Sequence, residues 1–222
     1  MTDESTVVVD SADSTEEVRI GTWMKDLLPR LPGAVRKVVR RELALACREF
    51  YVETCSWQVL IGPKTAKSGR SRYSLSPYDD HSNVIRVLSV EYNGSPLRMY
   101  PRKPMRGSQT GDAPDSYYLE GIDNVILYPT PTVQATSALN FFVALAPKPD
   151  SDYLPKIALT HHYDAILDGT LGRMMSHPAK PYSNPTLGTY HLQRFRAAIG
   201  TFSALGRQGN TVGQQWSYPR FT

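Results

Sequence analysis

Two short clusters of histidine and acidic residues are the first candidates for metal chemistry. They are His161, His162 and Asp164 in one segment, and Asp79, Asp80 and His81 in another. Imidazole and carboxylate groups bind transition metals. Adjacent residues on a helix point about 100° apart, so one ion cannot readily bind both histidines, and a partly buried helical pair is the favoured interpretation. The second cluster falls in an expected loop and lacks a fourth ligand. We predict no metal site and no cofactor.

Gly62–Gly69 has the composition of a phosphate-binding loop. It lacks the spacing G-x-x-x-x-G-K-[ST] that cradles a nucleotide. The basic residues of the loop from Gly62 to Arg72 are Lys64, Lys67, Arg70 and Arg72. We interpret it as a solvated loop, with a DNA-facing loop as the alternative. The chain also lacks the G-x-S-x-G and H-E-x-x-H motifs. We therefore predict no catalytic residues and a protein that is not an enzyme.

A second basic group consists of Arg98, Arg102, Lys103 and Arg106. Nucleic-acid surfaces interleave basic residues with stacking aromatic rings, and here only Tyr100 is close. An intersubunit contact or a solvated face is the favoured interpretation.

The two cysteines, Cys47 and Cys55, are expected on one helix, eight residues apart. That separation is about 12 Å along a helix, beyond the ~7 Å Cα limit for a disulfide. We interpret both as reduced, small core residues.

Charge is distributed unevenly along the chain. The formal net charge is +4, but residues 1–20 hold six acidic residues against Arg19, which gives −5 there and +9 elsewhere. A basic body with an acidic arm suggests contacts with oppositely charged partners, with solubility alone as the simpler alternative. The polar N-terminus does not resemble a secretory signal, and no run approaches the ~20 apolar residues of a membrane helix. We expect a protein made in the cytoplasm, with no membrane partner.

Three segments have the periodicity of amphipathic helices. The first runs from Ala34 to about Thr54 without Pro or Gly, the second opens at Leu154-Pro155, and the third ends at Gly206, a C-terminal cap. Their expected core residues are Val35, Val39, Leu43, Ala46 and Phe50; Leu159, Tyr163, Ile166, Leu167, Thr170 and Met174; and Leu192, Phe195, Ile199 and Phe202. The opposite side of the first helix carries Arg36, Lys37, Arg40 and Arg41.

Between Trp57 and about Ala146 the pattern is that of strands. Short runs rich in Val, Ile, Tyr and Phe are separated by turn residues, which predicts an antiparallel β-domain of roughly five to seven strands. Asn93-Gly94 is a strong hairpin signal, because both residues tolerate positive φ. The expected strands are Trp57–Ile61, Val84–Tyr92, Pro96–Tyr100, Tyr117–Leu119, Val125–Tyr128 and Ala138–Leu145.

This order predicts an α+β fold. We expect a small helical bundle, with one N-terminal and two C-terminal helices, that carries an inserted antiparallel β-domain and extended N- and C-terminal tails. The predicted parts are an acidic N-terminal arm (1–22), the helical bundle (23–56 and 150–206), the inserted β-domain (57–149) and a C-terminal docking tail (207–222).

The predicted tail has neither a helical period nor β alternation. It carries Trp216, Tyr218 and Phe221 beside Arg220, and aromatic and arginine side chains are the types that anchor interfaces. Three exposed rings on a free tail would promote aggregation. We therefore predict that residues 207–222 dock on a partner.

Several of these segments together resemble a known family. The relevant residues are Ala44, Ala46, Glu49, Phe50, Thr54 and Trp57; Val87, Val90, Asn93, Gly94 and Leu97; Tyr128–Pro131; Leu154, Pro155, Tyr163, Ile166, Gly169 and Leu171; and Pro181, Tyr182, Asn184, Pro185, Tyr190 and Phe195. In this order, from about Trp23 to the C-terminus, the chain resembles the head-to-tail adaptor proteins of tailed bacteriophages, also called head-completion or connector proteins.

The resemblance implies a structural virion protein at the head-tail junction. Such a protein forms a ring, usually twelvefold, that binds the portal protein above and tail or stopper proteins below, and double-stranded DNA passes through its channel without sequence readout. We assign portal docking to Trp216, Tyr218, Pro219, Arg220 and Phe221. The alternatives are another neck or tail structural protein, such as a stopper or tail-tube component, and a non-specific DNA-binding protein.

Overall fold

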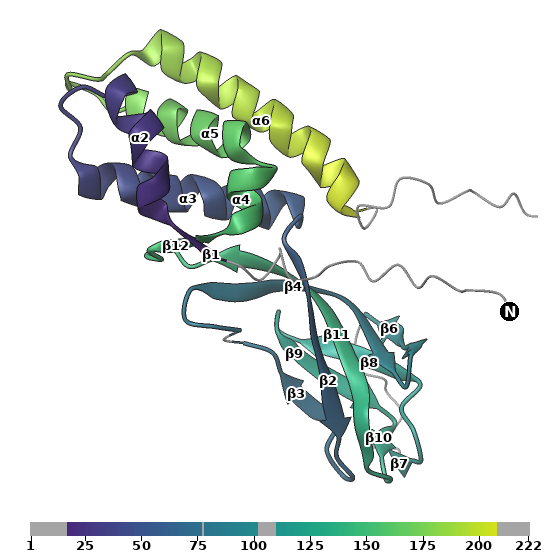
Figure 1. Ribbon diagram of the computed structural model, residues 1–222. Coiled ribbons are helices and arrows are strands. Elements are labelled where there is room, and N and C mark those ends of the chain that lie inside the picture. The colour runs from purple at the N-terminus through teal and green to yellow at the C-terminus, as the bar shows by residue number, and fades with distance from the viewer. Residues whose placement is uncertain (1–16, 77, 102–109, 208–222) are drawn as a thin grey trace, which may run out of the picture.

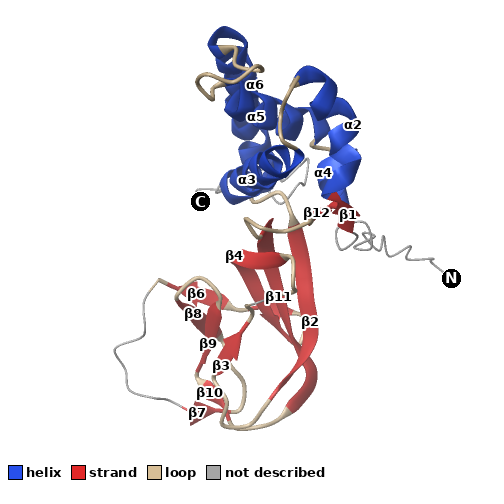
Figure 2. Ribbon diagram, turned by 90° about the vertical axis from the view of Figure 1, so that its left-hand side faces the viewer, coloured by secondary structure: helices blue, strands red, loops and turns tan. Residues whose placement is uncertain are grey.

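Helices gather at one end of the molecule and strands at the other. The computed structural model describes residues 17–76, 78–101 and 110–207, and Figures 1 and 2 show the two ends from perpendicular directions. The helices are α2 (Met24–Leu27), α3 (Arg36–Thr54), α4 (Lys156–Thr160), α5 (Tyr163–Met175) and α6 (Pro185–Arg207), with the 3-10 helices η1 (Ile20–Trp23) and η2 (Leu28–Arg30) beside α2.

The described strands form four sheets. The first has the order β2 (Gln58–Ala66), β11 (Ala135–Pro147), β4 (Ser82–Tyr92), β5 (Ser95–Pro96), and the second β3 (Arg72–Ser74), β9 (Asn124–Tyr128), β8 (Ser116–Glu120), β6 (Arg98–Tyr100). Two small sheets pair β1 (Glu17–Arg19) with β12 (Tyr153–Pro155) and β7 (Thr110–Gly111) with β10 (Thr130–Pro131). Pairing is antiparallel except for β6 with β8 and β7 with β10.

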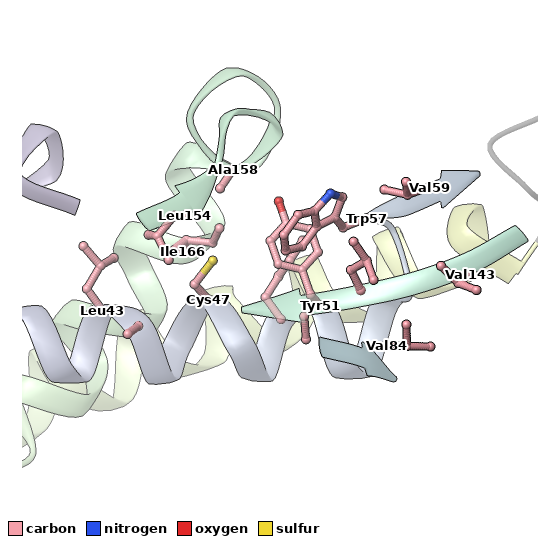
Figure 3. Close-up of a cluster of buried hydrophobic side chains, with 14 of the residues drawn as sticks. Leu43, Cys47, Tyr51, Trp57, Val59, Val84, Val143, Leu154, Ala158 and Ile166 are labelled. Carbon is pink, nitrogen blue, oxygen red and sulfur yellow. The ribbon is translucent and has the colours of Figure 1, made fainter. Parts of the chain in front are cut away.

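One continuous cluster of buried side chains joins the helices to the sheets. Figure 3 shows part of it, where residues of α3 approach the start of β2 and strand β11. The ring of Tyr51 on α3 lies 5.7 Å from that of Trp57, and Val59 and Val143 continue the cluster into the first sheet. The helical end and the strand end therefore share a core.

The predicted fold class, a small helical bundle with an inserted antiparallel β-domain, is wrong. Strands hold 34% of the described residues and helices 38%, spread over four sheets and five α-helices. Two strand pairs are parallel, and Glu17–Arg19, expected in an extended arm, pairs with Tyr153–Pro155. The sheets join segments far apart in sequence, which local periodicity cannot reveal. The predicted domain boundaries stay a prediction.

The first predicted helix is confirmed as α3, and four of its five expected core residues are buried. The fifth, Val35, is 63% exposed because it precedes the first helical turn as the N-cap residue. Cys47 lies within α3, but Cys55 ends it in the left-handed conformation with φ 51°. Both cysteines are buried and free.

The second predicted helix is two helices. Leu154-Pro155 belongs to β12, α4 ends at Thr160, and α5 begins at Tyr163. The third helix, α6, begins at Pro185, where the side-chain oxygen of Asn184 accepts a hydrogen bond from the N–H of Leu187 at 3.1 Å. This is an N-cap with proline at the first helical position. The helix continues past the expected cap at Gly206.

The Asn93-Gly94 hairpin is confirmed, with φ of 49° and 75° at its two turn residues. Two expectations nearby are wrong. The predicted basic loop, Gly62 to Arg72, is strand over its first five residues, because β2 continues to Ala66 along β11. The strand expected over Pro96–Tyr100 splits, so that β5 stays with β4 while β6 joins β8 in the second sheet.

Candidate interaction surfaces

The predicted docking residues lie outside the residues that the structure describes. These are Trp216, Tyr218, Pro219, Arg220 and Phe221. Three residues of the second basic group, Arg102, Lys103 and Arg106, also lie outside the described ranges. Their roles stay predictions. The described surface offers two other places where charged side chains gather.

The larger is an open cleft of about 1140 Å³, which we call the basic cleft. It is lined by five basic and two acidic residues together with smaller side chains. The lining residues are Arg19, Gly21, Met24, Arg36, Lys37, Arg40, Arg41, Ala44 and 149–153. It therefore lies between the first turns of α3, the segment from β1 to α2, and the loop that enters β12.

Helical geometry explains why α3 presents its cations together. Arg36, Lys37, Arg40 and Arg41 occupy positions i, i+1, i+4 and i+5, which share one side of a helix. The opposite side of α3 is fixed in the core by its buried apolar residues. Because the apolar face of α3 is buried, its four cations lie on the exposed side of the helix, where they line the cleft.

The opposite wall is held in place by contacts with β1. The backbone N–H of Ile20 donates to the carbonyl of Asp152 at 3.0 Å, and the Arg19 Nε donates to the Tyr153 hydroxyl at 3.3 Å. Arg40 forms an ion pair with Asp152 across the cleft. The arrangement brings residues more than 100 positions apart in sequence onto one surface.

Most of the cleft's positive charge is uncompensated. Arg36, Lys37 and Arg41 are exposed, and none forms an ion pair with any residue in the described part of the chain. The Arg40–Asp152 pair is itself solvent-exposed, with side-chain exposures of 44% and 66%. Exposed pairs of this kind stabilise a fold by only about 0–1 kcal/mol and exchange partners easily. The cleft can therefore bind an anionic group.

The second place is a hollow of about 470 Å³ between the α4–α5 junction and α6. At its edge the carboxylate of Asp168, 6% exposed, is held by two side chains of α6. Its Oδ1 lies 2.7 Å from His191 Nδ1, and its Oδ2 accepts from Arg194 Nε at 3.0 Å. Because both oxygens are occupied, this cluster joins α5 to α6.

The adjacent histidines His161 and His162 have different environments. His161 is exposed, whereas His162 is buried and its Nδ1 lies 3.0 Å from the hydroxyl of Tyr51. Burial, and to a lesser extent the neighbouring His161, lowers the pKa of His162 to about 4. His162 is therefore a neutral core residue at pH 7. The pair is partly buried, as expected, but it lies between α4 and α5 rather than on a helix.

The other acidic cluster shapes a turn. The carboxylate of Asp79 accepts hydrogen bonds from the backbone N–H groups of His81 and Ser82 and from the Ser82 hydroxyl. Lys148 donates to the backbone carbonyls of Asp79 and Asp80. Over residues 17–76, 78–101 and 110–207, no three His, Cys, Asp or Glu side chains are grouped to hold a metal ion.

Only one wall of the basic cleft, that formed by α3, could be predicted from the sequence. Sequence reasoning identified the cations on α3 but missed Arg19, Asp150 and Asp152, because the strand pair that brings them together is three residues long. It also missed the Asp168 cluster. A signal was present there, since Asp168 follows the expected core residues Ile166 and Leu167 directly.

The described surface thus carries an open, charged cleft, and the two other polar clusters hold elements of the fold together. The chain matches the model of the SU10 adaptor protein family over residues 16–219 and belongs to that family. None of the curated proteins matches it.

Membership confirms the resemblance to phage head-to-tail adaptors. The chain is a structural adaptor protein of a phage and a component of the virion. A structural adaptor is not an enzyme class. Within the described ranges, no helix has the length and apolar character needed to cross a membrane.

Proposed function

We propose that the chain forms an adaptor ring of twelve copies between the portal protein and the tail. The ring would complete the head and extend the channel through which double-stranded DNA passes without sequence readout. Tail or stopper proteins would bind its other side. The observation that carries the proposal is the family match, which covers the helices, the sheets and the C-terminal segment as far as Pro219.

The shared core supports a mechanical role for each subunit. A ring that joins two assemblies must transmit force between its portal side and its tail side. The continuous cluster of buried side chains ties α3 to the first sheet through Tyr51 and Trp57, both 2% exposed or less. Interiors packed in this way have low compressibility and transmit strain.

The length of the C-terminal segment supports its proposed role in portal docking. It follows α6, a helix of 23 residues that is about 35 Å long. Fifteen residues follow Arg207, a length that could span up to ~50 Å if fully extended. Trp216, Tyr218, Pro219, Arg220 and Phe221 would be the portal-binding residues.

The test is to mix the full-length chain with purified portal rings and image the products by electron microscopy. We expect one added ring on one end of the portal, and loss of that ring when Trp216, Tyr218 and Phe221 are all replaced by alanine. The control replaces three exposed apolar residues of the strand end, Tyr100, Ile122 and Val133, by alanine. It should bind as the wild type does.

A folded chain that adds no ring to the portal would refute the adaptor-ring proposal and favour a stopper or tail-tube component. Normal attachment of the triple-alanine tail variant would refute the docking assignment alone. DNA binding that falls steeply with salt, in the absence of portal binding, would favour the DNA-binding alternative.

A further inference from the structure

We propose that the basic cleft binds the acidic N-terminal segment, residues 1–16, of a neighbouring copy of the same chain. The proposal rests on the adaptor ring proposed above, since a ring supplies a neighbour at fixed distance and orientation. It adds a specific contact between subunits.

Charge complementarity is the first argument. Residues 1–16 contain five carboxylates and no Lys or Arg: Asp3, Glu4, Asp10, Asp13 and Glu16. The cleft presents Arg36, Lys37 and Arg41 without ion-pair partners in the described chain. Arg40 already binds a carboxylate, that of Asp152, in the same cleft. The occupant that fits is a carboxylate-bearing peptide.

The spacing of charges favours this peptide over DNA. Asp150 and Asp152 line the same cleft, and a nucleic-acid backbone has a phosphate at every nucleotide, so it would set phosphates against both carboxylates. Residues 1–16 have five uncharged positions between Glu4 and Asp10. A peptide of that pattern can place neutral residues opposite the cleft's own acids and its carboxylates opposite the cations.

Strand polarity indicates that the segment comes from a neighbour. In the β1–β12 pair, Arg19 lies opposite Tyr153, a residue of the cleft, while Val18 lies opposite Leu154 and Glu17 opposite Pro155. Each step back toward the N-terminus therefore leads away from the cleft, by about 7 Å over two residues. Glu17, the first described residue, therefore lies at the end of the strand pair that is farther from its own cleft.

The segment is long compared with the elements of its own subunit. Sixteen residues span up to about 55 Å when extended, more than the ~35 Å length of α6. The family match begins at residue 16, so four of the five acids lie before it. The contact would thus be an addition to the features that the family model covers.

Photo-crosslinking in the assembled ring tests the proposal. A full-length chain with a photoreactive phenylalanine analogue in place of Ser11 is mixed in equal amounts with a ¹⁵N-labelled full-length chain, assembled on portal rings and irradiated. Mass spectrometry then identifies the linked peptides. We expect unlabelled residues 1–16 joined to ¹⁵N-labelled peptides that contain residues 36–41 or 149–153.

The matched variants change only the labelled acceptor. Arg36→Glu/Lys37→Glu/Arg41→Glu should lower the yield of the mixed-label product at least about tenfold. Lys67→Glu/Lys180→Glu/Arg196→Glu makes the same change in net charge at exposed positions outside the cleft and should leave the yield unchanged. Both triples replace exposed side chains, and circular dichroism confirms that the acceptors are folded.

The outcomes separate this proposal from the proposed function. Rings that form on the portal but give no product with the cleft, or products only within unlabelled chains, would overturn the neighbour contact and leave the adaptor ring intact. An unchanged crosslinking yield with Arg36→Glu/Lys37→Glu/Arg41→Glu would also overturn it. This holds even if that variant changes the binding of DNA. Absence of any ring would overturn both.

Discussion

Replacing Gly172 by alanine tests how closely α5 and α6 cross. A Cβ at this position would lie 2.7 Å from Cγ of Leu192 and 3.0 Å from the backbone nitrogen of Leu192. Carbon atoms in favourable contact are about 3.5–4.0 Å apart. The Leu192 side chain could rotate away, but its backbone belongs to α6 and can move only if the helix moves.

The expected effect is the difference between two terms. Overpacking in a close-packed core costs about 1–3 kcal/mol, and the backbone contact places this site near the upper end. Alanine is better than glycine in a helix by about 1 kcal/mol. Gly172→Ala should therefore destabilise the protein by about 2 kcal/mol. At Gly200, in α6, a Cβ would meet nothing within 4 Å, so Gly200→Ala should stabilise by about 0.5–1 kcal/mol.

Urea unfolding of the full-length chain, followed by circular dichroism, measures both variants. With a slope of about 2 kcal/mol per molar urea, the midpoint should fall by about 1 M for Gly172→Ala and rise by about 0.3–0.5 M for Gly200→Ala. The pair of variants is informative because the same substitution should change the free energy of unfolding in opposite directions on adjacent helices. A Gly172→Ala midpoint at or above that of the wild type would refute the close crossing.

Two further predictions concern buried polar groups. The pKa of His162 is about 4 in the folded protein against an ordinary 6.5, so the unfolded chain binds more protons between those pH values. The free energy of unfolding should therefore fall by about 2 kcal/mol from pH 7 to pH 5. His162→Gln, which cannot titrate there, should lose clearly less stability in the same urea titration. Asp168→Ala should destabilise by about 2–3 kcal/mol because it leaves His191 buried without its 2.7 Å partner. Asp168→Asn should lose only about half as much stability as Asp168→Ala in thermal unfolding. Equal melting temperatures for the two variants would contradict the pairing.

Elements with a strong internal pattern could be predicted from the sequence. The 19 residues of α3 form a helix with one apolar face, and Asn93-Gly94 permits few conformations other than a tight turn. The signal in these cases is local, so no knowledge of the partner is needed. The order of such elements was also sufficient to indicate the family that the match over residues 16–219 shows.

Pairing between distant segments could not be predicted in the same way. β1 and β12 are three residues each and have no alternation long enough to recognise. Their pairing alone divides the expected second helix, since Tyr153–Pro155 must be extended to bind Glu17–Arg19. It also creates the second wall of the basic cleft, which explains why only the α3 side of that site was found.

The same strand pair bears on whether the N-terminal segment could hold two subunits together. A force on residues 1–16 would act first on β1, Glu17–Arg19, which is held by a three-residue pairing with β12. Water can readily replace the few backbone hydrogen bonds of such a short pair. The next residues resist it better, because Ile20 is 1% exposed and Trp23 is fully buried, with its ring stacked on Tyr163 at 4.6 Å. Withdrawing them would expose two large apolar side chains, at about 1.5–3 kcal/mol each. The proposed contact with a neighbour would thus be anchored in the core of its own subunit, and its strength would be limited by the charge pairs in the cleft rather than by the attachment of the segment.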